Sequence, residues 1–353
     1  MNNLVIKAGP VAYEKIRRDG LQPDMISHLV GAAGGPKWLV LNRLDRYLFG
    51  EWFRGRSKPL VAVGSSVGSW RLACAAQRDP LAAIQRFEDA YLAQRYALKP
   101  TPAEITAEAR RMLGVILGAG GAQEVINHPW LRLHIIAARA RLGTGSSSPL
   151  TQKAAMLAAI AANTLHRRGL ALFFERVVFH TPPEPRLQLR ADGFRTHQVL
   201  LHEANLSNAL LASAAIPMVM QALREVGGAP AGALLDGGMV DYHMDLPLQP
   251  PAGIVLLPHF SETVTPGWLD KFLPWRKPGN LTHTVLIAPS REFIARLPNG
   301  KIPDRNDFYR YSGRDEERER DWRRTVNECQ RLADEFIYIM DRDRLPQVLK
   351  TWN

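Results

Sequence analysis

Short apolar runs followed by glycine-rich turns dominate the first eighty residues. Ile26 to Val30 is apolar enough for a buried strand and runs into the turn Gly31-Ala-Ala-Gly-Gly35. Apolar residues with helical spacing follow from Leu39 to Leu48. The pattern then repeats, because Leu60 to Val63 is apolar and residues 66–77 again suit a helix. This alternation predicts an α/β fold with a central, mostly parallel sheet flanked by helices.

The remaining pattern extends this sheet. Residues 80–170 are predicted to be mostly helical, with a strand at Leu131 to Ala137. Phe173 to His180 and His197 to His202 are predicted strands that could form a hairpin, and short apolar runs at 233–235, 254–257 and 284–288 predict three more. Residues 301–324 are strongly charged, which favours a solvated loop or an exposed helix. No internal repeat divides the 353 residues, so we expect a single domain, 1–353.

The stretch VAVGSSVGSW (61–70) carries the first candidate chemistry. A serine between a strand and a helix can stand on a sharp turn, where its hydroxyl is exposed for nucleophilic attack. Side chains two residues before and after that serine would crowd one another, so glycine is expected at both places. Gly64 and Gly68 occupy them around Ser66. The pattern favours Ser66 as a nucleophile over a purely structural glycine turn.

The earlier turn, GAAGGPK (31–37), could hold a negative charge. Amide groups at the start of a helix attract phosphates or the oxyanion of an acyl-transfer reaction. Pro36 has no N–H, so the available donors are Gly34, Gly35 and Lys37. The spacing matches neither a P-loop nor a dinucleotide fingerprint. An oxyanion hole, a phosphate cradle and a plain helix start therefore all remain open.

The base that would activate Ser66 has several candidates. His259 follows a predicted strand, as the histidine of an α/β-hydrolase triad would. Asp236 ends another strand and precedes two glycines, so it could act as the base directly. Asp241, His243 and Asp245 alternate onto one face of an extended segment, as metal ligands could, although a polar loop is the simpler interpretation and we expect no metal.

Four stretches in order resemble the patatin-like phospholipases. They are GAAGGPKW (31–38), GSSVG (64–68), ASAAIP (212–217) and DGG (236–238). The resemblance covers roughly residues 27–248, the motif-bearing core, and leaves 249–353 as an extension that completes or decorates it. Two positions depart from the family's oxyanion loop: Ala33 replaces its first glycine, and the bulky Trp38 replaces its last.

The resemblance implies a patatin-like three-layer sandwich and a chemistry without cofactors. By position, Ser66 is similar to the family's nucleophile and Asp236 to its general base and acid, forming a dyad without histidine. Gly34, Gly35 and Lys37 fall where the family's oxyanion loop lies. The implied activity is hydrolysis of lipid esters through an acyl-enzyme. A thioesterase, an acyltransferase or a catalytically silent lipid-binding module with the same fold remain alternatives.

The net charge of +11 favours an anionic partner, such as a lipid surface, nucleic acid or an acidic ligand, or else it reflects a generally basic surface that only affects solubility. A lipid surface fits best, since no recognition helix, zinc spacing or RNA-binding pattern accompanies the charge, and we expect no nucleic-acid partner. The segment PGWLDKFLPWRK (266–277) mixes large apolar residues with cations. We expect its Trp268, Leu269, Phe272 and Trp275 to contact an anionic membrane, or else to be buried against the core.

Cysteine content and the length of the apolar segments indicate where in the cell the protein is expected. It contains two cysteines, too few for a disulfide framework, which fits a reducing compartment. The first twenty residues lack the apolar core of a secretory signal, and the longest apolar run, Ala209 to Leu223, is too short to span a bilayer. We therefore expect a cytoplasmic protein that contacts membranes peripherally.

Overall fold

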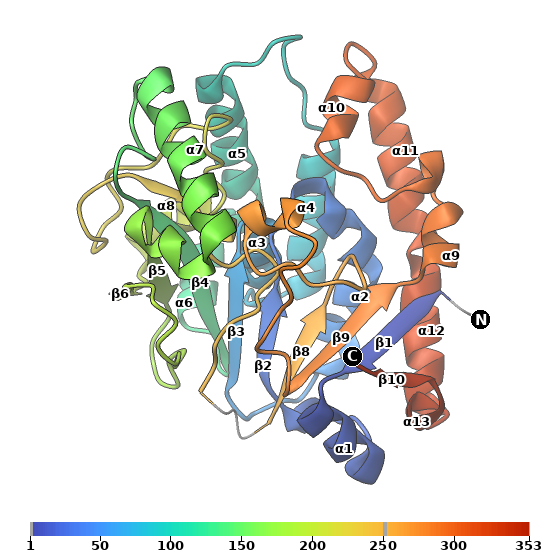
Figure 1. Ribbon diagram of the computed structural model, residues 1–353. Helices are drawn as coiled ribbons and strands as arrows, with labels where there is room; N and C mark the ends of the chain where they lie inside the picture. Colours follow the sequence, from blue (N-terminus) through green and yellow to red (C-terminus); the bar gives the residue numbers. More distant parts are fainter. Residues whose placement is uncertain (1–2, 250–252, 353) are drawn as a thin grey trace.

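One ten-stranded sheet runs through the protein (Figure 1). The computed structural model describes residues 3–249 and 253–352. The strand order is β10-β1-β9-β8-β2-β3-β4-β5-β6, and β7 pairs with β4. The strands are β1 (Leu4–Ala8), β2 (Ile26–Gly31), β3 (Leu60–Ser65), β4 (Leu131–Ala140), β5 (Phe174–His180), β6 (Thr196–Leu200), β7 (Leu234–Asp236), β8 (Ile254–Pro258), β9 (Thr284–Pro289) and β10 (Leu349–Thr351).

Parallel pairing predominates in this sheet, as predicted. Six of the nine described pairings are parallel, and the antiparallel ones join β1 to β9, β4 to β5 and β4 to β7. In the register of β2 with β3, Gly31 lies opposite Gly64. The two glycine turns that follow these strands therefore lie side by side at the carboxyl edge of the sheet, where ligands bind in such folds.

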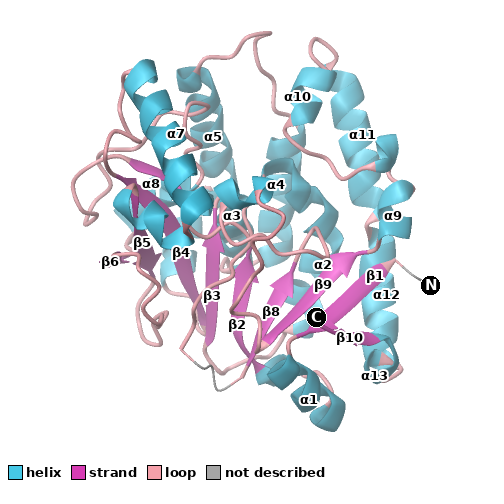
Figure 2. Cartoon of the chain, in the orientation of Figure 1, coloured by secondary structure: helices cyan, strands magenta, loops and turns pink. Residues whose placement is uncertain are grey.

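Helices fill most of the remaining chain (Figure 2). The longer ones have ordinary start signals: Pro80 and Pro102 open α4 and α5, and the side chains of Asp79 and Thr101 cap them. The α-helices are α1 (Pro10–Asp19), α2 (Asn42–Tyr47), α3 (Val67–Ala75), α4 (Pro80–Leu92), α5 (Pro102–Leu117), α6 (Gly121–Ile126), α7 (Pro149–Leu165), α8 (Glu203–Ser213), α9 (Arg291–Ala295), α10 (Asn306–Arg310), α11 (Asp315–Glu328), α12 (Gln330–Asp341) and α13 (Leu345–Val348). Shorter helical turns are η1 (Pro23–Met25), η2 (Gly35–Leu41), η3 (Leu48–Trp52), η4 (Arg167–Leu172), η5 (Gly237–Met239), η6 (Trp268–Phe272) and η7 (Pro298–Gly300).

The sheet forms the middle of three layers. Side chains on one face, such as Ala62 of β3 and Ile135 of β4, join a large core with α2, α3, α4, α5, α8 and α12. Alternate residues, such as Val63 and Ile136, face a second core closed by loop residues. On that second face, α7, η4 and η6 cover the far ends of β4 and β5. The predicted α/β fold, a mostly parallel sheet flanked by helices, is thus confirmed.

Two local predictions were wrong. Residues 173–180 and 197–202 form no hairpin, because β5 and β6 pair in parallel. Residues 301–324 are not simply solvated, because Arg318 and Trp322 of α11 are almost fully buried. The many charged residues of this range suggested exposure to solvent, but Arg318 is buried and forms an ion pair with Asp315 at 3.2 Å. Among the described residues, no helix combines the length and apolar character that crossing a bilayer would require.

Candidate active site

Ser66 lies between β3 and α3 in a strained conformation. Its φ is 53° and its ψ is −135°, a backbone region that residues other than glycine rarely occupy. The two flanking glycines make the turn possible. A Cβ on Gly64 would lie 2.6 Å from the amide nitrogen of Ser69, and one on Gly68 would lie 2.0 Å from the carbonyl oxygen of Gly31. Gly68 is therefore required by contact with β2 as well as by the turn itself.

The length of β4 brings Asp236 to this turn. β3 pairs with β4 as far as Ser65 opposite Ile136. β4 continues beyond that point, and β7 pairs with the continuation from Ala137, which lies opposite Asp236. Since β5 occupies the other edge of β4, β7 follows β3 along the same edge. Two strands that are distant in sequence thus meet end to end, with Ser66 and Asp236 at the junction.

The two side chains are in direct contact. The Ser66 hydroxyl donates to Asp236 Oδ2 at 2.7 Å, and the Gly238 N–H donates to Asp236 Oδ1 at 2.7 Å. The exposed fractions are 3% for Ser66 and 5% for Asp236. Burial raises the pKa of Asp236, while the Ser66 hydrogen bond, the charge of Arg305 and the Gly238 N–H oppose that rise. The result is a desolvated carboxylate that can accept the proton of a serine hydroxyl.

A second serine, Ser213, supports the turn, and its role was not predicted. The hydroxyl of Ser213, at the end of α8, accepts from the Ser66 N–H at 2.8 Å and donates to the Ile136 carbonyl at 2.6 Å. It thereby joins the strained turn to β4. The sequence offered one hint of this role, because Ser213 interrupts the apolar run 209–223. Its stretch, ASAAIP (212–217), was noted only for its resemblance to the family.

The second glycine turn presents unused donors. Within the described residues, the N–H groups of Gly34 and Gly35 have no hydrogen-bond acceptor, whereas the Lys37 N–H faces the Gly34 carbonyl at 3.4 Å. Gly35 lines the same cavity as Ser66. Gly34 and Gly35 are therefore free to donate to an oxyanion, and Lys37 is the weakest of the three expected donors.

Trp38, which departs from the family's loop pattern, is buried in the hydrophobic core. Its side chain is almost completely buried and stacks on Phe87, with ring centroids 4.0 Å apart. Tyr91 meets its edge at 5.6 Å. The large side chain is therefore accommodated in the core, where it packs η2 against α4.

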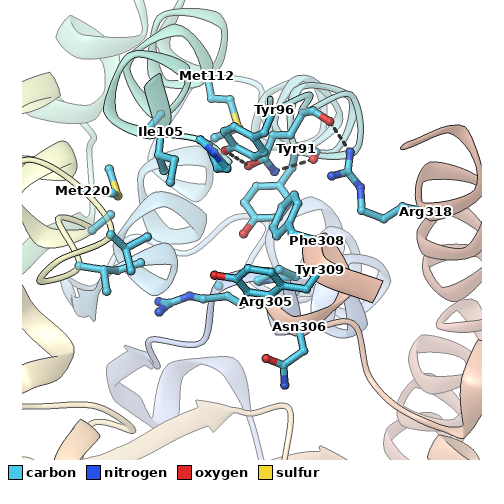
Figure 3. A pocket seen from close by; sticks show the side chains of 18 of the residues that line it. Tyr91, Tyr96, Ile105, Met112, Met220, Arg305, Asn306, Phe308, Tyr309 and Arg318 are labelled. Atoms are coloured by element: carbon cyan, nitrogen blue, oxygen red, sulfur yellow. Dashed lines mark hydrogen bonds between the residues drawn. The ribbon is translucent and has the colours of Figure 1, made fainter. Parts of the chain in front are cut away.

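A cavity of about 360 Å³ opens beside Ser66. Most of its wall is apolar and comes from α4, α5 and the segment after α8, including Ile105, Met112 and Met220 (Figure 3). The C-terminal segment closes the opposite side with Arg305, Phe308 and Tyr309, which the sequence pattern had suggested were solvated. A polar, reactive end and an apolar body suit a ligand with a hydrocarbon chain.

The other candidate bases have different partners. Among the described residues, no histidine hydrogen-bonds to Ser66. His259 instead contacts the backbone of Ser261 through Nδ1, and burial lowers its pKa to about 3. Asp241 forms a buried ion pair with Arg176 at 2.6 Å, and Asp245 accepts from the backbone of 279–280. The described residues contain no group of three or more His, Cys, Asp or Glu side chains that could hold a metal ion.

The aromatic segment 268–275 is divided between core and surface. Leu269 is buried with the apolar cluster around η4 and β5, so the expectation that it contacts a membrane was wrong. Trp268 is half-buried against the same cluster. Phe272 and Trp275 are exposed, at 67% and 62%. Asp270 anchors the segment through a 2.7 Å ion pair with Arg167.

Comparison with known families agrees with this geometry. Searches among curated proteins and among solved structures find no match to the chain. The family model for the patatin-like phospholipases matches residues 39–247, more than half of the chain. The matched range contains Ser66, Ser213 and Asp236. The chain therefore belongs to the patatin-like phospholipase family.

Proposed function

We propose that the protein is a serine acyl hydrolase that cleaves lipid esters, with Ser66 as nucleophile and Asp236 as general base and acid. One observation carries the proposal: the 2.7 Å hydrogen bond from Ser66 Oγ to Asp236 Oδ2 at the wall of an apolar cavity. A nucleophile paired with a desolvated base is the arrangement that serine catalysis needs. The family's general activity, hydrolysis of lipid esters, points the same way.

The first half of the reaction forms an acyl-enzyme. Asp236 Oδ2 takes the hydroxyl proton while Ser66 Oγ bonds to the ester carbonyl carbon. The carbonyl oxygen becomes an oxyanion and accepts from the Gly34 and Gly35 N–H groups, which have no partner in the described structure. The tetrahedral intermediate then breaks its bond to the alcohol oxygen, and Asp236 returns the proton to that leaving oxygen.

The second half releases the acid. Asp236 accepts a proton from water as the water oxygen attacks the acyl carbon, and the same donors hold the new oxyanion. When the bond to Ser66 Oγ breaks, Asp236 returns the proton to the serine. Elbow residues Gly64 and Gly68 and the hydroxyl of Ser213 keep the nucleophile in place throughout.

The strain at Ser66 argues against a silent lipid-binding module. A positive φ at a serine costs about 1–3 kcal/mol, and burial of an ionisable carboxyl beside it costs more. A module that only bound lipid would gain nothing from either. The same dyad could also serve a thioesterase or transfer the acyl group to an acceptor other than water.

We further propose that the protein meets its substrate at an anionic membrane surface. Phe272 and Trp275 are exposed beside Lys271 and Lys277. The adjacent helix α7, bound to this segment by the hydrogen bond from Asn163 to Asp270, extends the apolar surface. Its exposed side chains are Leu150, Leu157, Ile160 and Leu165. Exposed apolar side chains with lysines beside them suit the interface of an anionic bilayer.

The chain is proposed to act as one domain in the cytoplasm. Strands β1, β2, β8, β9 and β10 lie outside the family match at 39–247, yet they pair within the same sheet as β3 to β6. Both cysteines are buried and free of disulfides, as suits a reducing compartment.

Hydrolysis assays on p-nitrophenyl esters and phospholipids test the proposed function. We expect Ser66→Ala and Asp236→Asn each to lower kcat by about a thousandfold or more. The matched carboxylate control is Asp241→Asn, which should lower stability through its pair with Arg176 but spare turnover per folded molecule. An inert wild type that also resists fluorophosphonate would favour the lipid-binding module.

A further inference from the structure

The side chain of Arg305 is a half-buried cation without a partner among the described residues. Among the buried and half-buried arginines of the described chain, it is the one with neither a hydrogen bond nor an ion pair. Its nearest acidic neighbour in sequence, Asp304, pairs instead with Lys301 at 3.0 Å. Desolvated charges are normally paired, so this guanidinium has donors to spare for a negative charge that forms beside it.

The position of Arg305 brings the guanidinium to the oxyanion turn. It lines the same cavity as Ser66 and Gly35, and Figure 3 shows it extending past Tyr309 into that cavity. Its Nε lies 3.3 Å from the place that a Cβ on Gly35 would occupy. Because Gly35 has no side chain, the guanidinium can approach the backbone of this turn directly.

The element that carries Arg305 is anchored to the rest of the fold. Arg305 immediately precedes α10, and its carbonyl accepts from the Phe308 N–H at 3.2 Å. Asp307 of the same helix is buried and accepts from Lys301 Nζ at 2.6 Å and from Trp322 Nε1 of α11 at 3.0 Å. A side chain on an anchored element can hold a preorganised position in a site.

The resting dyad does not use the donors of Arg305. Asp236 accepts from the Ser66 hydroxyl through Oδ2 and from the Gly238 N–H through Oδ1, and in the described structure it accepts no hydrogen bond from Arg305. Burial raises the pKa of Asp236 and the positive charge of Arg305 opposes that rise, so the cation acts electrostatically on the dyad. During the proposed acylation the proton moves to Asp236, and the negative charge appears on the carbonyl oxygen at the oxyanion turn. The unused donors of Arg305 are then beside a new anion.

From this arrangement we infer that Arg305 is a further catalytic residue, whose guanidinium donates to the oxyanion together with the N–H groups of Gly34 and Gly35. The inference rests on the proposed function and adds to it a charged donor from the C-terminal segment. The guanidinium keeps its protons throughout. The proton of Ser66 still passes to Asp236 and then to the leaving oxygen, as in the two-step reaction above. Arg305 lies outside the family match at 39–247 and outside the four motifs that carry the resemblance.

A donor of this kind raises kcat more than it favours substrate binding. An ester carbonyl is neutral before attack and gains its negative charge in the transition state, where a charge-assisted hydrogen bond to it is strongest. Removal of one oxyanion donor lowers kcat by about a hundredfold to a thousandfold. We therefore expect the loss of Arg305 to lower kcat with little change in KM.

Hydrolysis of p-nitrophenyl butyrate, a small neutral ester, tests the inference. Measurement on the plateau above the acid limb of the pH profile keeps Asp236 ionised in every variant, so a change in its pKa contributes nothing. Arg305→Gln should lower kcat about a hundredfold, and Arg305→Lys, which keeps a positive charge, should recover part of that loss. Arg310→Gln, an exposed arginine on α10 outside the cavity, is the matched control and should keep the wild-type kcat.

A transition-state analogue separates contact with the oxyanion from a purely structural role. A short alkyl trifluoromethyl ketone forms a hemiketal with the serine and places a negative oxygen in the site, whereas the corresponding methyl ketone stays neutral. Arg305→Gln should weaken inhibition by the trifluoromethyl ketone about a hundredfold and leave inhibition by the methyl ketone unchanged. The residual activity of the variant is sufficient to measure both inhibition constants, and thermal unfolding checks that it folds.

The outcomes separate this inference from the proposed function. An unchanged kcat in Arg305→Gln would overturn the catalytic role of Arg305. A lower kcat with unchanged inhibition by the trifluoromethyl ketone would also overturn it, because the residue would then support the fold and not the oxyanion. Either result with an active wild type leaves the proposed function intact. A wild type that neither hydrolyses the ester nor forms the hemiketal, and so behaves like Ser66→Ala, would overturn the proposed function and this inference with it.

Discussion

The hydroxyl of Ser66 donates a 2.7 Å hydrogen bond to Asp236, although 170 residues separate them in the chain. Strand geometry explains the contact. β4 continues beyond the end of β3, and the short strand β7 pairs with the free part of that edge. Ser66 and Asp236, the proposed nucleophile and base, are thus fixed by the backbone pairing of three strands rather than by flexible loops, which favours a site that is organised before substrate binds.

Replacement of Ser213 should impair the turn without touching substrate. Ser213→Ala leaves the buried Ser66 N–H without its acceptor, which costs about 1–3 kcal/mol of stability. Because the nucleophile is displaced, we expect kcat to fall several-fold with little change in KM. Urea denaturation and steady-state kinetics measure the two effects. Ser207→Ala, on the same helix, is the control. A stability loss with unchanged kcat would make Ser213 a structural residue only.

Contact between the two glycine turns should make Gly68 irreplaceable. A Cβ there would lie 2.0 Å from the Gly31 carbonyl oxygen, so Gly68→Ala must separate β2 from α3, at about 3 kcal/mol. Gly114→Ala is the matched control, because a Cβ at that helical position meets open space and should stabilise α5 by about 0.5–1 kcal/mol. Thermal unfolding compares them, and similar melting temperatures would contradict the packing argument.

The acid limb of the pH profile should report Asp236. The base works when ionised, so kcat/KM on a neutral ester should fall as the pH drops through its pKa, which burial raises. The positive charge of Arg305 lowers that pKa, so removing the charge raises it. We therefore expect Arg305→Gln to shift the acid limb to higher pH and Arg310→Gln to leave it in place. A shift to lower pH would contradict this electrostatic account.

The sequence predicted the sheet better than it predicted the surroundings of the site. Apolar runs located β2 and β3 because buried parallel strands leave a continuous apolar pattern. The same pattern cannot give strand direction, so β5 and β6 were wrongly joined as a hairpin. Charge density in 301–324 concealed a cavity wall, because Arg318 is buried and donates to the carbonyl of Gln94, a contact between distant segments that no local pattern predicts.

Site residues were likewise predictable where a local sequence pattern marks them and not where only the fold brings them together. Ser66 and Asp236 were singled out because glycines mark their turns and the order of their motifs resembles a family, and the structure brings the two side chains into contact. Arg305 had no local signal, because only the fold brings it to the cavity that Ser66 lines. Leu269 was expected at a membrane because its segment mixes large apolar residues with cations, a pattern that cannot tell which apolar side chains turn toward the core.

Membrane contact should depend on the exposed aromatic pair. Phe272→Ala/Trp275→Ala should weaken binding to vesicles of phosphatidylglycerol and phosphatidylcholine about tenfold, because large apolar side chains leave the interface. Val11→Ala, on α1 at the far end of the molecule from α7 (Figure 1), is the control. Sedimentation with vesicles measures binding, and circular dichroism checks folding. Unchanged sedimentation of the double variant would exclude this surface.

The most direct test of the central claim is to map the residue that a fluorophosphonate modifies. Intact mass and peptide mass spectrometry should find one adduct, on Ser66, that is absent in Ser66→Ala and strongly slowed in Asp236→Asn. The adjacent Ser65→Ala should label normally, because the Ser65 hydroxyl donates to the Asp241 carbonyl instead of the dyad. Labelling that persists in Ser66→Ala, or a wild type that stays unmodified, would contradict the assignment of Ser66 as the nucleophile.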